Sequence, residues 1–208
     1  MIRWILVAFV VIAAAIVVSQ WTMADVAEPD YETLMDDSPF AVRRYDPMIV
    51  ATVEVTGGRR SAANAGFRAL ADYIFGANVP PGTTVPVVQE RARDGTKIDM
   101  TAPVLQTPTD EQRWTVSFVM PEDFTMETLP RPKSPDVIVD ARPPETLAVL
   151  RFSGIPTMRR IEAKEAALRM WMENRGLEPA GGARYAFYDP PWTIPFLRRN
   201  EVMIPAAD

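Results

Sequence analysis

The 208-residue chain contains neither cysteine nor histidine. Without cysteine the protein has no disulfide bonds and no thiolate chemistry, and without both residue types it lacks the usual ligands of zinc. The absence of histidine also excludes a Ser-His-Asp triad and haem iron ligated by histidine. Carboxylates, lysine and tyrosine remain as general bases, and the sequence shows no paired-carboxylate motif. The composition therefore argues against an enzyme.

Basic residues are outnumbered by acidic ones: the chain has 22 lysine and arginine residues and 27 aspartate and glutamate residues, so its net charge is −5. Adjacent basic residues never form more than a pair. Nucleic-acid binding requires a concentrated basic patch, so no nucleic-acid partner is expected. The 20 prolines predict many turns and irregular edges rather than a helix bundle. The length suits a single domain of moderate size.

A long apolar run, from Ile5 to Val18, lies near the N-terminus, and Trp4 and Trp21 extend it. Its length is near the lower limit of a membrane-spanning helix, which needs about 17–25 residues. Arg3 precedes the run and acidic residues follow it, an asymmetry that places the N-terminus in the cytoplasm. We therefore predict that residues 1–24 form a signal anchor, a single transmembrane helix in the inner membrane, with the rest of the chain facing the periplasm. A cleaved signal peptide that releases a periplasmic or secreted domain is the alternative.

Residues 25–38 are acidic and show no periodicity, which predicts a tether between the anchor and a domain over residues 39–208. Within the domain, alternating apolar residues between turn-forming residues predict strands. The predicted strands are Phe40–Tyr45, Ile49–Val55, Val85–Arg91 with a hairpin turn at Asp94-Gly95, Lys97–Val104, Trp114–Met120, Val137–Val139, Leu147–Phe152, a strand that starts at Tyr185, and Asn200–Ile204.

Two amphipathic helices separate these strands. The first runs from Ala62 to Phe75, between a capping Ser61 and Gly76, and the second lies between Thr157 and Gly176. Their inner stripes are Phe67, Leu70, Ala71 and Ile74 in the first helix and Ile161, Leu168, Trp171 and Met172 in the second. The order strand–helix–strand–strand thus occurs twice. This repeat predicts an α+β fold, a distorted β-barrel built from two pseudo-repeats with two flanking helices.

The stretch from Tyr185 to Ile204 ends the second repeat with an interrupted strand. Three prolines within residues 190–195 remove backbone donors and fix φ, so this loop cannot lie inside a sheet. Two large apolar side chains, Trp192 and Phe196, stand in the stiff loop. Either they pack on the sheet beneath them, or they contact an apolar ligand. Packing is favoured, because most large apolar side chains are buried.

Several other side chains have predicted structural roles. One arginine of the Arg43-Arg44 pair should form an ion pair with Glu54 or Glu201, because the two arginines of a strand point to opposite faces. Asn200 and Glu201 should hydrogen-bond to backbone groups at the start of the last strand. Met100 is expected in the core.

Short motifs from Phe40 to Ile204 occur in an order that is typical of one family. They are FAVRRY at residues 40–45, the helix at 64–78, KIDMTAPV at 97–104, FVMP at 118–121, LPRP at 129–132, FSG at 152–154, YDPP at 188–191 and RRNEV at 198–202. Through these motifs the chain resembles the SOUL haem-binding protein family over nearly the whole domain. The resemblance implies a distorted β-barrel of two pseudo-repeats with two flanking helices, in agreement with the internal repeat.

The resemblance also implies binding of haem or a related tetrapyrrole in a shallow apolar site beside the first helix, with basic residues near the propionates. On this chain the site consists of Asn64, Phe67, Arg68 and Ala71, with Trp192 and Phe196 as a second wall. Some relatives use a histidine as axial ligand, and this chain has none. Haem or porphyrin is therefore expected to bind reversibly, with weak or no axial ligation. No catalytic or metal-ligating residue is predicted.

The preferred hypothesis is a membrane-anchored, periplasm-facing module that binds a tetrapyrrole for buffering or transfer. One alternative is a structural or partner-binding domain of the cell envelope without a small ligand. Another is a hydrolase that uses carboxylates. A monomer is the favoured oligomeric state.

Overall fold

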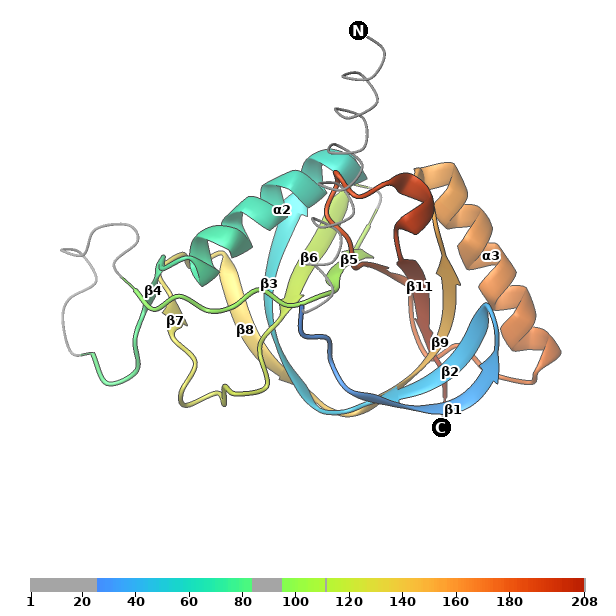
Figure 1. Cartoon of the computed structure of the whole chain (residues 1–208), viewed down its shortest axis with the longest axis horizontal. Coiled ribbons are helices and arrows are strands. Elements are labelled where there is room, and N and C mark those ends of the chain that lie inside the picture. Colours follow the sequence, from blue (N-terminus) through green and yellow to red (C-terminus); the bar gives the residue numbers. More distant parts are fainter. Residues whose placement is uncertain (1–25, 84–94, 111, 208) are drawn as a thin grey trace, which may run out of the picture.

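The computed structural model describes residues 26–83, 95–110 and 112–207, which form a curled antiparallel sheet with two helices on its outer side (Figure 1). The predicted signal anchor lies outside the described residues, as does the predicted strand Val85–Arg91 with Asp94 of its turn. In the described part of the chain, no helix combines the length and the apolar character that crossing a membrane requires.

Nine strands form the main sheet, in the spatial order β1-β2-β9-β11-β10-β5-β6-β3-β8. Their bounds are β1 Tyr31–Asp37, β2 Phe40–Tyr45, β3 Met48–Thr56, β5 Val104–Pro108, β6 Arg113–Val119, β8 Val137–Arg142, β9 Glu145–Phe152, β10 Arg184–Phe187 and β11 Asn200–Pro205. A separate short pair joins β4 (Asn78–Val79) to β7 (Arg131–Pro132). Because β1 and β8 lie at the two edges, the sheet is a half-barrel rather than a closed barrel.

The order strand–helix–strand–strand occurs twice in the main sheet, but in the first half β5 and β6 stand in place of the predicted strands Val85–Arg91, which lies outside the described residues, and Lys97–Val104. One half contains β3, helix α2 (Arg59–Ile74), β5 and β6, and the other contains β9, helix α3 (Met158–Asn174), β10 and β11. The halves meet where β5 pairs with β10. Helix α2 packs on β3 and β6, and α3 packs on β9 and β11. The α+β class and the two flanking helices are therefore as predicted, whereas the predicted distorted β-barrel is an open, curled half-barrel.

Each helix covers an apolar cluster on the outer face of the sheet. The α3 cluster contains the whole predicted inner stripe of that helix, Ile161, Leu168, Trp171 and Met172. The α2 cluster contains Val116 and Phe118 from the alternating face of β6, together with Leu70 and Ile74 of the helix. Both clusters arise because period-3.6 and period-2 apolar patterns face each other across the same interface.

Helix α2 approaches the sheet closely at Gly66, where a Cβ atom would lie 2.6 Å from Val116 Cγ2. The residues that α2 buries are Ala62, Gly66, Leu70, Tyr73 and Ile74. The prediction of an inner stripe through Phe67 and Ala71 is therefore wrong for Phe67, which is 39% exposed, while Ala71 is half-buried. The missing side chain at Gly66 lets that side of the helix face the sheet, and Phe67 turns toward solvent.

The structure differs from the predicted tether at Tyr31–Asp37, which forms β1. This strand pairs with β2, from Tyr31 opposite Tyr45 to Asp37 opposite Phe40. Most of its side chains are exposed. An edge strand held mainly by backbone hydrogen bonds needs no buried apolar face, so its sequence shows little alternation.

The predicted strand Lys97–Val104 is also different, because only its last residue belongs to β5. The remainder forms no ladder with other described residues apart from a single bridge at Lys97. The amide of Ile98 donates instead to the carbonyl of Ile74, at the end of α2. Met100, expected in the core, lies in this irregular segment and is 39% exposed.

Candidate functional site

The outer face of α2 carries four of the residues that the sequence placed in the site. Asn64 lies three and four positions before Phe67 and Arg68, and Ala71 lies four and three positions after them, so all four share one face of the helix. Asn64 and Arg68 are exposed. The Phe67 ring rests edge-on against Phe118, with 5.3 Å between the ring centroids, and remains open to solvent. The structure therefore brings these four residues together on a surface with one exposed aromatic ring.

The loop between β10 and β11 carries the other two site residues. Trp192 and Phe196 are 70% and 72% exposed, so the favoured packing interpretation is wrong for both. The buried residue of the loop is Thr193. Arg198 holds the loop from within, because its Nε donates to the Thr193 carbonyl at 2.8 Å and its Nη2 donates to the Pro191 carbonyl. A loop stiffened in this way presents its rings to a ligand at little further cost in entropy.

The loop adjoins the N-terminal end of α2 (Figure 1). Arg59, the first residue of α2, lies over the ring of Phe187 at the end of β10, with 5.5 Å between the guanidinium carbon and the ring centroid. Asn64 is therefore at the end of the helix face nearer the loop, and Ala71 lies about two turns further along. Among the described residues, neither ring of the loop stacks directly on Phe67.

Sequence reasoning missed a group of arginines at the beginning of both helices. Arg59-Arg60 lie in the first turn of α2 and Arg159-Arg160 in the first turn of α3, and neither turn contains an acidic residue. A hollow that joins the two helix ends is lined by Gly58, Arg59, Arg60, Ser61, Thr157 and Met158. Cations at a helix N-terminus are unfavourable, because the helix dipole is positive there. The arrangement concentrates positive potential close to the aromatic loop, where it suits a carboxylate.

Arg59 is partly buried at this junction. Its Nη1 donates to Gln106 Oε1 at 3.1 Å, and its Nη2 donates to the carbonyl of Pro156. Its Nε is buried without a hydrogen-bond partner among the described residues. Burial lowers the pKa of Arg59, and the neighbouring Arg60 lowers it further. The sequence has an Arg-Arg pair at the equivalent place in each repeat. Only the structure shows that the starts of the two helices lie next to each other.

A buried ion network lies next to the loop. Glu201 is fully buried, and its two carboxylate oxygens accept hydrogen bonds from Arg43 Nη1 at 3.2 and 3.0 Å. Arg199 Nε and Tyr188 Oη donate to the same carboxylate at 3.0 and 2.8 Å. The predicted Arg43–Glu201 pair is thus confirmed, whereas Glu54 forms an ion pair on the surface. Burial, followed by the Glu201 charge, raises the pKa of Tyr188, which stays protonated and donates. These contacts fix the strand that closes the loop.

The model of the SOUL heme-binding protein family matches residues 26–205, which is most of the chain, and the protein therefore belongs to this family. Family membership supports haem or a porphyrin as ligand. No curated protein sequence matches the chain.

Solved structures share the fold. The C-terminal domain of EcmrR matches with a TM-score of 0.59 and 14% sequence identity, over 86% of this chain and 98% of that domain. A hydrolase from Listeria innocua matches with a TM-score of 0.51 and 11% identity, over 91% of this chain and 96% of the hydrolase. At these identities the likeness shows the fold alone, and no activity is carried over.

Proposed function

We propose that this protein binds haem or a related tetrapyrrole reversibly on the outer face of α2. The observation that carries the proposal is the exposure of three aromatic side chains, Phe67, Trp192 and Phe196, on one helix face and the adjoining loop. A tetrapyrrole is a flat apolar ring system, and aromatic rings held on rigid supports stack on such a surface at little entropic cost. The side chains therefore fit the apolar part of the ligand.

The carboxylates of the ligand also have partners at this surface. Arg68 lies on the same helix face as Phe67, and Arg60 lies about two turns nearer the loop. Exposed guanidinium groups bind carboxylates through paired hydrogen bonds. A tetrapyrrole between the helix and the loop would place its propionates within reach of these arginines.

The interior of the sheet is too small for the same ligand. The cavity on its concave face has a volume of about 160 Å³. Pockets for drug-sized ligands occupy about 300–1,000 Å³. The groove beside this cavity is larger, about 620 Å³, but carboxylates line it and would repel the propionates. We therefore place the tetrapyrrole outside, on α2.

The chain has no histidine or cysteine to ligate iron, so affinity must come from burial of the ring. Burying about 400 Å² of apolar surface at about 25 cal/mol per Å² gives about 10 kcal/mol. Association and ordering remove at least about 4 kcal/mol of this. The remaining free energy corresponds to a Kd in the micromolar range or weaker, which suits buffering or transfer rather than a permanent prosthetic group.

An absorbance titration of the full chain with haemin and with metal-free protoporphyrin tests the proposal. Both should bind saturably and within a few-fold of each other, and Phe67→Ala and Arg68→Gln should each weaken both several-fold. Met170→Ala is the matched control, because Met170 is an exposed apolar residue on α3. If neither tetrapyrrole binds saturably, the proposal fails and a partner-binding domain without a small ligand is the better description.

We further propose that a signal anchor holds this domain on the periplasmic side of the inner membrane. The support is the apolar run from Ile5 to Val18, with Arg3 before it and acidic residues after it. Full-length protein should then sediment with membranes and resist carbonate extraction. Recovery of a soluble species that begins near Asp25 would identify a cleaved signal instead.

A further inference from the structure

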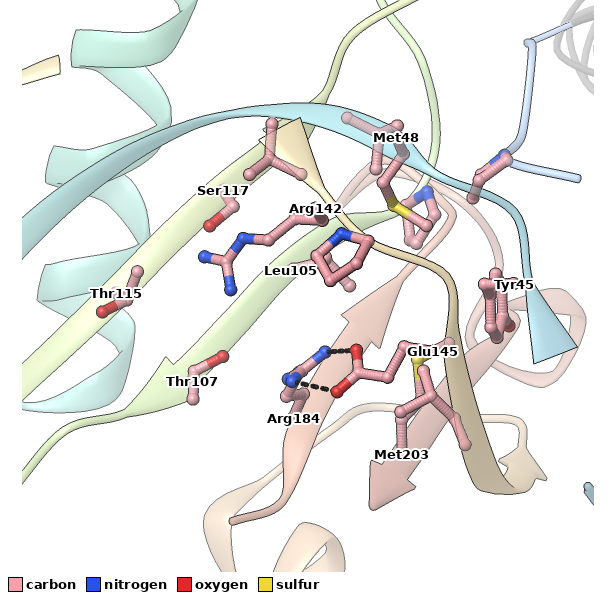
Figure 2. Close-up of a pocket in the computed structure, with 16 residues that line it drawn as sticks. Tyr45, Met48, Leu105, Thr107, Thr115, Ser117, Arg142, Glu145, Arg184 and Met203 are labelled. Carbon is pink, nitrogen blue, oxygen red and sulfur yellow. Dashed lines mark hydrogen bonds and ion pairs between the residues drawn. The ribbon is translucent and has the colours of Figure 1, made fainter. Parts of the chain in front are cut away.

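The cavity on the concave face of the sheet is a second candidate binding site, distinct from the tetrapyrrole surface (Figure 2). Its volume is about 160 Å³, and it is enclosed by strands of both repeats. Helices α2 and α3 cover the opposite face, so this cavity is separate from the exposed stripe of α2. The apolar part of its wall includes Met48, Val50, Leu105, Leu147 and Met203.

The polar part of the wall has an unbalanced positive charge. Arg184 donates from Nη1 and Nη2 to the two carboxylate oxygens of Glu145, so these two charges neutralise each other. Arg142, at the end of β8, also lines the cavity and forms no ion pair with any described residue. Figure 2 shows its guanidinium reaching into the cavity above the Arg184–Glu145 pair.

Hydroxyl groups lie on the same side as this guanidinium. Thr107, Thr115 and Ser117 point into the cavity from β5 and β6 (Figure 2). Ser117 Oγ is 2.9 Å from Thr52 Oγ1 and shares a hydrogen bond with it. Thr115 Oγ1 likewise shares a hydrogen bond with Thr109 Oγ1, at 3.2 Å. The hydroxyl group of Thr107 can therefore donate to an anionic group that Arg142 holds.

We propose that this cavity binds a small monocarboxylate with a single ring or a short apolar chain. The carboxylate pairs with Arg142 and accepts a hydrogen bond from Thr107, and the apolar part lies between Met48 and Met203. The size limit follows from the volume, because an apolar cavity of about 150 Å³ holds one benzene molecule.

The neighbouring groove restricts the charge of the ligand. This groove, of about 620 Å³, shares Met48 and Arg142 with the cavity. Its other lining residues include five carboxylates, Glu28, Asp30, Asp46, Glu122 and Asp123, of which Glu28 pairs with Arg199. Like charges repel a second negative group at the mouth. A monocarboxylate is therefore preferred over a dicarboxylate of the same ring size.

Methionine methyl resonances of the full chain, labelled with ¹³C, provide a local test. On titration with benzoate, the methyl signals of Met48 and Met203 should shift saturably. The signal of Met170, exposed on α3, should stay unchanged. Benzamide has the same shape without the charge and should bind at least tenfold more weakly, and phthalate should bind more weakly than benzoate.

Arg142→Gln tests the charge directly. Arg142 is exposed to solvent, so the substitution should leave the fold intact, while benzoate affinity falls at least tenfold and benzamide affinity stays unchanged. Arg151→Gln is the matched control, since Arg151 is an exposed arginine of β9 that does not line the cavity. Equal binding of benzoate and benzamide, an unchanged benzoate affinity in Arg142→Gln, or no saturable shift of Met48 and Met203 would overturn the proposal. None of these outcomes depends on tetrapyrrole binding.

Discussion

Arg43 and Glu201 are 158 positions apart in the sequence, and their side chains form a buried ion pair with an N–O distance of 3.0 Å. The pair connects β2 to β11, which lie on either side of β9 in the sheet. Glu201 also holds Arg199, whose Nη1 donates to Glu28 before β1 at 3.0 and 2.8 Å. One carboxylate thus links the first and last parts of the described chain.

Replacing this carboxylate by its amide should destabilise the protein strongly. Breaking a buried ion pair leaves an uncompensated charge and costs about 3–5 kcal/mol. We expect Glu201→Gln to lower the free energy of unfolding in urea by at least about 3 kcal/mol. The control is Glu54→Gln, because Glu54 pairs with Arg113 on the surface, where an ion pair contributes about 0–1 kcal/mol. Equal losses in the two variants would contradict a central role for Glu201.

Tyr45 gives the network a pH dependence. Burial, and next the charge of Glu201, raises the pKa of Tyr45 from 10.0 to about 12. A pKa that is higher in the folded state adds stability below the unfolded pKa, and this stability is lost as the pH rises through the folded pKa. The free energy of unfolding should therefore fall between about pH 10 and pH 12, with at most about 2.7 kcal/mol from this residue.

Urea unfolding at several pH values across this window measures the effect. Tyr45→Phe should make the decline shallower, since the phenol that must ionise is gone. If the free energy of unfolding falls as steeply with pH in Tyr45→Phe as in the unchanged protein, the ionisation of other groups causes the fall.

The close contact of Gly66 predicts a second, independent loss of stability. A Cβ atom at Gly66 would meet Val116 Cγ2 at 2.6 Å, and Val116 is fully buried beneath the helix. Forcing extra volume into a packed interface costs about 1–3 kcal/mol. Gly66→Ala should lower the free energy of unfolding by that amount, as measured in urea. Gly182→Ala should have little effect, because no atom lies within 4 Å of a Cβ atom there, and a similar loss in both variants would exclude the contact as the cause.

Local patterns predicted the parts of the fold that bury one face. The alternation of β6 and the inner stripe of α3 were both correct, because their apolar spacing matches the surface that each element covers. Residues Tyr31–Asp37 escaped prediction, since an edge strand needs a partner strand more than an apolar face. The segment that starts at Lys97 alternates in sequence, yet its amide at Ile98 bonds to the end of α2. Whether such a segment joins a sheet depends on hydrogen-bond partners that are distant in the sequence.

The members of the candidate site remain a prediction from the sequence, and the structure adds how they are arranged. The resemblance to the family named the face of α2, and the structure places its four residues together. The environment of Phe67 depended on Gly66, because the absence of one side chain decides which side of the helix faces the sheet. The hollow between the two helix ends is lined by Arg59 and Arg60 of α2 and by Thr157 and Met158 at the start of α3, so it forms only after the two repeats fold against each other.

Replacing Trp192 distinguishes a side chain that contacts the ligand from one that packs in the fold. Its side chain is 70% exposed and stands in a loop that Arg198 and the prolines already hold, so the fold does not depend on its ring. Stacking of an aromatic ring on a planar partner is worth roughly 0.5–1.5 kcal/mol beyond the area that it buries. We expect Trp192→Ala to weaken the binding of haemin and of protoporphyrin several-fold in absorbance titrations, while the melting temperature falls only slightly. Ile138→Ala is the control, because Ile138 is an exposed apolar residue on the edge strand β8, and it should change neither quantity. If Trp192→Ala leaves both affinities unchanged while Phe67→Ala lowers them, the ligand rests on α2 alone and the loop is not its second wall.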